Sequence, residues 1–249
     1  MALSMVAFNR YRHHNIVYVR DNPGKPAIII LSKEGIAQGC TFSMFCYGIG
    51  IMPLAERMRE TVEDTLQPWY ADDAATAGWA IMNARCMKFL CDHGPRYGYH
   101  PEPDKSIYVC KGEDEAVARD VYKEFDIEIK FRRGHRYLGS FLGCRTLKED
   151  YVRRKVEMWT SAVRVMGRLA LRYPQSVYAG ITSCLQGEWQ YLSRVTSDIS
   201  YLFEPLELAL REQLIPAFIG VDWQDITPGF REQLGLAVNR GGLGIRNPM

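Results

Sequence analysis

The chain has 249 residues, of which 47% are apolar and 24% charged, a balance that excludes a disordered tail, a collagen-like fibre and a small disulfide scaffold. Its net charge of +2 indicates no class of partner. Seven cysteines at scattered spacings favour a reducing compartment, and the N-terminal residues lack the pattern of a secretory signal. We therefore expect an intracellular protein, nuclear or cytoplasmic.

Two β-strands and a helix are predicted first. Apolar runs at residues 16–19 and 27–31 flank an Asp-Asn-Pro-Gly turn, which is typical of a hairpin. Residues 41–59 have helical spacing, with Phe45, Ile49 and Met52 on one face. Residues 35–55 carry no charge, but this run holds four glycines and Pro53, so it predicts a buried helix and no membrane partner.

Short strands and helices alternate as far as residue 145, and the remainder is helical. The first part is predicted to contain a hairpin at 66–70 and 74–79, helices at 79–92 and 114–124, and strands at 106–110, 127–131 and 137–142. Long helical patterns then cover 146–172, 177–195 and 199–214. This predicts an α+β fold: residues 1–145 form a small antiparallel sheet with helices on one face, and residues 146–249 form an all-helical subdomain.

The sharpest local feature is Asp72-Asp73 at the tip of the second hairpin. Two adjacent carboxylates are costly there unless a cation compensates them, and Mg²⁺ (or Mn²⁺) prefers carboxylate oxygens. Aspartate is also a common turn residue, so an ordinary acidic turn is the alternative.

Other motifs in chain order extend this pattern. Gln38-Gly39 and Ser43 precede and begin the first long helix, Tyr70 opens the Tyr-Ala-Asp-Asp run, Lys105 precedes a strand, and Leu138-Gly139 lies in an apolar stretch. In this order and spacing the set resembles the palm of a reverse transcriptase of the non-LTR retrotransposon type. The all-helical part would correspond to the thumb of that family.

The resemblance implies metal-dependent transfer of a nucleotide from a dNTP to a DNA primer on an RNA template. It implies Asp72 as the metal ligand, Asp73 as its supporting neighbour and Lys105 as the group facing the departing pyrophosphate, with these three as catalytic residues. Gln38, Gly39, Ser43 and Tyr70 would border the nucleotide and template, and Leu138-Gly139 would lie in the hairpin that grips the primer. No cofactor beyond the metal is implied.

The sequence departs from the family pattern in two places. Thr41 stands where a proline is common. The family also places another metal-binding aspartate on a strand well upstream of Gln38, where this chain has only Asp21 and Glu34. Because two-metal transfer needs carboxylates from separate strands, we expect the fingers and first palm motif to be missing and this chain to be inactive alone.

Basic residues are concentrated in one segment. Residues 130–172 contain 12 Lys and Arg against 3 Asp and Glu. At 100° per residue, a stripe about 100° wide holds four arginines, namely Arg153, Arg164, Arg168 and Arg172. Such a stripe suits contact with phosphates, whereas Val156, Val163 and Leu169 are predicted to pack inward. A solvated helix with pairs to Glu149 and Glu157 is the alternative.

Three functions remain open from the sequence. The chain is a fragment of an RNA-directed DNA polymerase, a non-catalytic remnant that binds nucleic acid, or a helical interaction protein with an ordinary Asp-Asp turn. Primer extension separates the first from the others. Salt-dependent binding to duplexes separates the second from the third.

Overall fold

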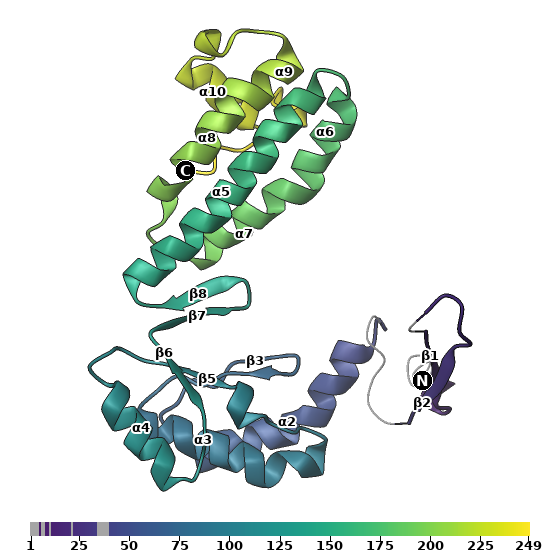
Figure 1. Cartoon of the computed structure of the whole chain (residues 1–249), viewed down its shortest axis with the longest axis vertical. Helices are drawn as coiled ribbons and strands as arrows, with labels where there is room; N and C mark the ends of the chain where they lie inside the picture. Colours follow the sequence, from purple (N-terminus) through teal and green to yellow (C-terminus); the bar gives the residue numbers. More distant parts are fainter. Residues whose placement is uncertain (1–4, 6–7, 10, 21, 34–39) are drawn as a thin grey trace. The chain divides into compact units, whose positions relative to one another are not determined.

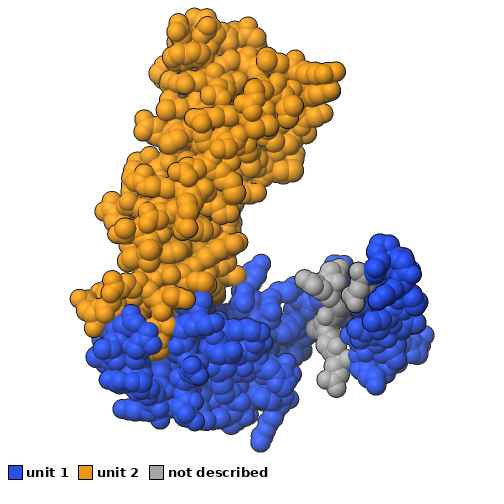
Figure 2. Space-filling view, in the orientation of Figure 1, with its two compact units in different colours: residues 1–107, 114–130 blue, residues 108–113, 131–249 orange. Residues whose placement is uncertain are grey.

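A computed structural model of the chain describes residues 5, 8–9, 11–20, 22–33 and 40–249. The fold is mixed α+β, as the sequence predicts, and it divides into two compact units (Figures 1 and 2). Unit 1 comprises residues 1–107 and 114–130, and unit 2 comprises residues 108–113 and 131–249. Helical unit 2 therefore includes the strands just before residue 145, which the sequence analysis assigned to the first subdomain.

The strands form four separate two-stranded pairs among the described residues, not the single small sheet that the sequence analysis predicted. Each strand has only two to five residues. The pairs are β1 (Asn15–Val19) with β2 (Ile28–Ser32), β3 (Trp69–Tyr70) with β4 (Asp73–Ala74), β5 (Ile107–Val109) with β6 (Lys130–Arg132), and β7 (Gly134–Tyr137) with β8 (Ser140–Gly143).

Helices supply most of the remaining structure. Those of unit 1 are α2 (Ser43–Thr61), α3 (Ala80–His93) and α4 (Glu115–Glu124). Those of unit 2 are α5 (Arg145–Ala170), α6 (Pro174–Gly180), α7 (Gln186–Val195), α8 (Glu204–Ala209), α9 (Ile215–Ile219) and α10 (Pro228–Gly235). No helix in the described part of the chain is long and apolar enough to span a bilayer.

Helix α2 buries a different face from the one predicted. Ile51, Leu54 and Met58 are buried with residues of α3, whereas Phe45 and Ile49 remain more than half exposed. The first half of α2 is apolar on both sides, so periodicity alone does not decide which side faces the core. Packing against α3 determines which face of α2 is buried.

Unit 2 is built around α5. Val156 and Val163 are buried along one side of this helix, as the sequence predicts, together with Val152. Leu169 is 47% exposed, and the prediction for it was wrong. Trp159 lies in the same core, with its ring centroid 6.2 Å from that of Trp189. Because one face of the 26-residue helix α5 is packed in the core, the side chains of its opposite face all project to solvent on the same side of unit 2.

The segment 242–246 is fastened to the helices by side chains. The Tyr178 hydroxyl donates to the Leu243 carbonyl at 2.7 Å. The buried Arg231 donates to both carboxylate oxygens of Glu207, at 2.6 and 2.8 Å, and to the Ile245 carbonyl at 2.8 Å. This segment includes the glycine-rich run at 241–244, whose backbone is held by side chains of the helices and which lacks the strand-then-helix setting of a phosphate-binding loop.

Candidate nucleic-acid interface

The Asp-Asp pair lies at the tip of the β3–β4 hairpin, as predicted. Tyr70 pairs with Asp73 across a two-residue turn formed by Ala71 and Asp72. Asp73 is the first residue of β4, but Asp72 lies in the turn, so the strand alternation expected between the two aspartates does not apply. Both aspartates are exposed.

Apolar contacts hold this hairpin on the core of unit 1. Trp69 and Ala74, which face each other across the strands, pack against the cluster formed by α2 and α3. The Trp69 ring meets the Tyr99 ring edge-on, with centroids 5.5 Å apart. The neighbouring pair, Tyr70 and Asp73, is left exposed, with Tyr70 61% exposed. The hairpin therefore presents an aromatic ring and two carboxylates to solvent.

Two tyrosines that the sequence analysis missed lie close to the carboxylates. Burial raises the pKa of Tyr47 on α2, and the charge of Asp72 raises it further. Burial also raises the pKa of Tyr99, and the nearby Tyr47, Asp73 and Asp72 add to that rise. Both phenols therefore keep their protons near neutral pH. The spacing of Tyr47, four residues after Ser43 on one helix face, is the signal that could have found it.

Ser43, Gln38 and Gly39 were predicted to act together. Ser43 begins α2, and its hydroxyl donates to the Cys40 carbonyl at 2.7 Å, so it closes a local turn at the helix start. Gln38 and Gly39 lie outside the described residues.

Lys105 ends a short 3₁₀ turn at Pro103–Lys105, just before β5. Its ammonium is paired with the Glu102 carboxylate, and this contact raises the pKa of Lys105. The side chain is 71% exposed. Lys105 therefore forms its ion pair with Glu102, and not with either aspartate of the β3–β4 hairpin.

The carboxylates at the hairpin tip are the candidate metal ligands of the chain. Among the described residues, no group of three or more His, Cys, Asp or Glu side chains is arranged to hold a metal ion. Asp72 and Asp73 supply two carboxylates, which suit a single Mg²⁺ completed by water and substrate phosphates. They do not supply the carboxylates from separate strands that a two-metal centre needs.

Leu138 and Gly139 form the turn of the β7–β8 hairpin. The strand predicted at 137–142 is thus interrupted by a turn, at the position where the resemblance implies a hairpin. Both have positive φ, 46° for Leu138 and 81° for Gly139, as in the turns that suit two-residue hairpins. Hydroxyls of two tyrosines hold the turn. Tyr191 donates to the Leu138 carbonyl, and Tyr151 donates to the Gly139 carbonyl at 3.0 Å.

Replacing Gly139 with alanine is expected to lower the free energy of unfolding by about 2–3 kcal/mol. Positive φ costs an L-residue about 1–2 kcal/mol, and the new Cβ would also lie 2.9 Å from the Tyr191 ring. Gly220 has φ 69° and open space around it, so Gly220→Ala is the matched control and should cost about 1 kcal/mol. Equal shifts of the two denaturation midpoints would contradict the role of the Tyr191 contact.

The predicted arginine stripe is exposed in unit 2. Arg153, Arg164 and Arg168 project from the solvent side of α5, and Arg172 follows just beyond the helix end. Arg153 lies 3.8 Å from Glu149, which also pairs with Arg145 at 2.7 Å. The ion pairs of the described residues include neither Arg164 nor Arg168.

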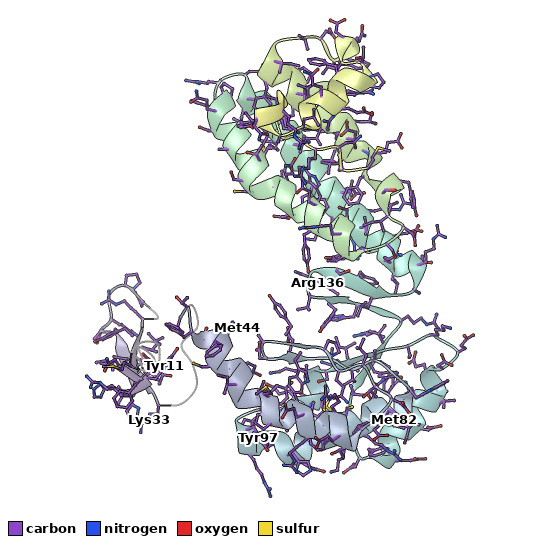
Figure 3. All side chains as sticks on the ribbon, turned by 180° about the vertical axis from the view of Figure 1, so that it is seen from behind. Tyr11, Lys33, Met44, Met82, Tyr97 and Arg136 are labelled. Atoms are coloured by element: carbon purple, nitrogen blue, oxygen red, sulfur yellow. The ribbon has the colours of Figure 1, made fainter. Side chains whose placement is uncertain are left out.

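The acidic residues of α5, namely Glu149, Asp150 and Glu157, all lie in the first half of the helix. Residues 158–172 contain three arginines and no aspartate or glutamate. Glu149 pairs with Arg145 and Arg153, as the alternative of a solvated helix predicts, but the ion pairs of the described residues do not include Glu157. The second half of the helix keeps its positive charge. Arg132, Arg133 and Arg136 are also exposed in unit 2 (Figure 3 labels Arg136 on β7). A rigid helix with unneutralised arginines is a surface that can bind polyanions without reading their sequence.

No known protein was found to be similar to this chain. Searches of protein-family models, of curated proteins and of solved structures found no match to the chain.

Proposed function

We propose that this chain is the palm-and-thumb part of a reverse-transcriptase-like polymerase and that it binds the backbone of RNA–DNA and DNA duplexes. Binding is independent of base sequence, and the chain alone does not extend a primer. The observation that carries this proposal is the solvent face of α5, where Arg164 and Arg168 are exposed and outside every ion pair of the described residues.

The face has the properties that phosphate binding needs. Arginine presents a planar fork of donors that matches phosphate oxygens, and it stays charged at every relevant pH. The buried side of α5, with Val152 and Val163 fully covered, fixes the direction of these arginines. Fixed cations lose less side-chain entropy on binding than cations on a mobile segment.

The β3–β4 hairpin supports the palm assignment. Asp72 and Asp73 are the residues that would hold Mg²⁺, which would supply charge neutralisation for nucleotide phosphates when bound. The neutral hydroxyls of Tyr47 and Tyr99 lie near these carboxylates and hold their protons. The described residues contain no third acidic partner for them, which is the reason for expecting no polymerisation by this chain.

The test uses the purified chain with labelled RNA–DNA and DNA duplexes of unrelated sequence. We expect binding to both, with the affinity falling steeply and linearly on a log–log plot as salt rises. In the same buffer with Mg²⁺ or Mn²⁺ and all four dNTPs, we expect no primer extension. Robust dNTP incorporation would contradict the second expectation. Absent or salt-independent binding would contradict the first and favour a helical interaction protein.

A further inference from the structure

A pocket of about 280 Å³ opens among three segments of unit 1, apart from the β3–β4 hairpin. The segments are the second half of α3, the turn at Pro103–Lys105 that precedes β5, and residues 125–128 between α4 and β6. The volume is just below the ~300 Å³ at which small-molecule sites usually begin. The pocket therefore has the size for one long side chain.

The walls of this pocket are largely apolar. Cys91, Pro103, Phe125 and Ile127 line it, and each of these residues is half-buried. Burial raises the pKa of the Cys91 thiol, so the thiol stays neutral and acts as a small apolar group. An occupant therefore needs an apolar part that contacts these walls.

Three exposed carboxylates line the same pocket, those of Asp104, Asp126 and Glu128. The ion pairs within the described part of the chain include none of the three. Lys88 also lines the pocket, but its ammonium lies 3.2 Å from the carboxylate of Asp92. The charge that complements this pocket is therefore positive.

The negative charge continues along α4. Residues 114–128 contain six Asp and Glu against two Lys and Arg. Both cations pair within the helix, Arg119 with Glu115 at 2.7 Å and Lys123 with Asp120 at 3.6 Å. An acidic surface that extends over a helix is larger than one small cation covers, so it favours a chain that carries several positive charges.

We infer that this pocket docks a basic segment of a partner protein, with one lysine or arginine side chain inserted in it. The apolar stem of that side chain lies against Phe125 and Ile127, and its charged head meets the carboxylates of Asp126 and Glu128. The ring of Phe125 also attracts a cation. This inference does not depend on the proposed function, because none of its residues belongs to the β3–β4 hairpin or to α5.

The test uses a short fluorescent peptide in which arginine alternates with glycine. The matched probe carries citrulline in place of each arginine, since citrulline keeps the shape of arginine and lacks its charge. Fluorescence anisotropy with the full chain measures the affinity for each peptide. We expect the arginine peptide to bind at least about ten-fold more tightly than the citrulline peptide.

Two double variants locate the binding site. Asp126→Asn combined with Glu128→Gln is expected to weaken binding of the arginine peptide about ten-fold. The control, Glu60→Gln combined with Glu63→Gln, removes the same charge from exposed carboxylates of unit 1 that do not line the pocket, and it should weaken binding less than about two-fold. Circular dichroism confirms that each variant folds.

Modification of Cys91 gives a second measurement in the unaltered chain. At a saturating concentration the arginine peptide should slow the reaction of Cys91 with methyl methanethiosulfonate at least about five-fold, because the inserted side chain covers the thiol. The exposed Cys184 of unit 2 should react at an unchanged rate. Mass spectrometry of the digested chain gives both rates.

Four results would overturn the inference. Equal weakening by the two double variants, or an unprotected Cys91, would mean that the peptide follows overall charge and not the pocket. Binding of ethylguanidinium as tight as that of the peptide would assign the pocket to a small cation. A dimer in analytical ultracentrifugation that dissociates on changing Asp126 and Glu128 would assign it to a second copy of this chain.

Discussion

Replacing Arg231 with methionine is expected to lower the free energy of unfolding of unit 2 by about 3–5 kcal/mol. Arg231 on α10 is 5% exposed and donates to both carboxylate oxygens of Glu207 on α8. Methionine fills much of the same volume but leaves Glu207 as an unpaired carboxylate in an apolar core. It also removes the donor that satisfies the Ile245 carbonyl.

Chemical denaturation monitored by tryptophan fluorescence measures this effect. The matched control is Arg240→Met, because Arg240 is exposed, and it should change stability by no more than about 0.5 kcal/mol. Glu207→Leu combined with Arg231→Met should recover a large part of the loss, since replacing both members of a buried ion pair leaves no unpaired charge. A double variant as unstable as the sum of the two single variants would show that the pair is not the cause.

Replacing Arg164 and Arg168 together with glutamine is expected to weaken binding to duplexes about 30-fold near 0.15 M salt. Each arginine that contacts a phosphate adds about 0.9 to the slope of log affinity against log salt, so the slope should fall by about 2. The loss should be the same for unrelated base sequences, because backbone contacts carry no sequence information. Fluorescence anisotropy with labelled duplexes gives both quantities.

The control for charge is Arg119→Gln combined with Lys123→Gln on α4 of unit 1. These side chains pair with Glu115 and Asp120, so their removal changes net charge by the same amount without touching the α5 face. We expect this variant to bind duplexes nearly as tightly as the unaltered chain. Equal weakening by both double variants would mean that overall charge, and not the arginine face, drives binding.

The sequence by itself determined where most helices and strands lie along the chain, but not the turn at Leu138-Gly139 or the pairing of the strands. Strand runs around an Asp-Asn-Pro-Gly turn became β1 and β2, and helical periodicity after residue 145 became the single long helix α5. Val156 and Val163 were correctly predicted to be buried, because polar and basic residues mark the opposite side of α5. The Asp72-Asp73 tip also followed from local pattern alone, since turn residues between short apolar runs leave few alternatives.

Only the tertiary structure decided which of two similarly apolar faces of a helix is buried. The first half of α2 is apolar on both sides in sequence, and packing on α3 buried Ile51 and Leu54 and left Phe45 exposed. The folded chain also brings Tyr47 near Asp72, 25 positions away in the sequence, where the charge of Asp72 adds to the rise of the Tyr47 pKa that burial causes. Local periodicity records how apolar residues repeat along one element, but burial depends on which other element covers each face, and that information is not local.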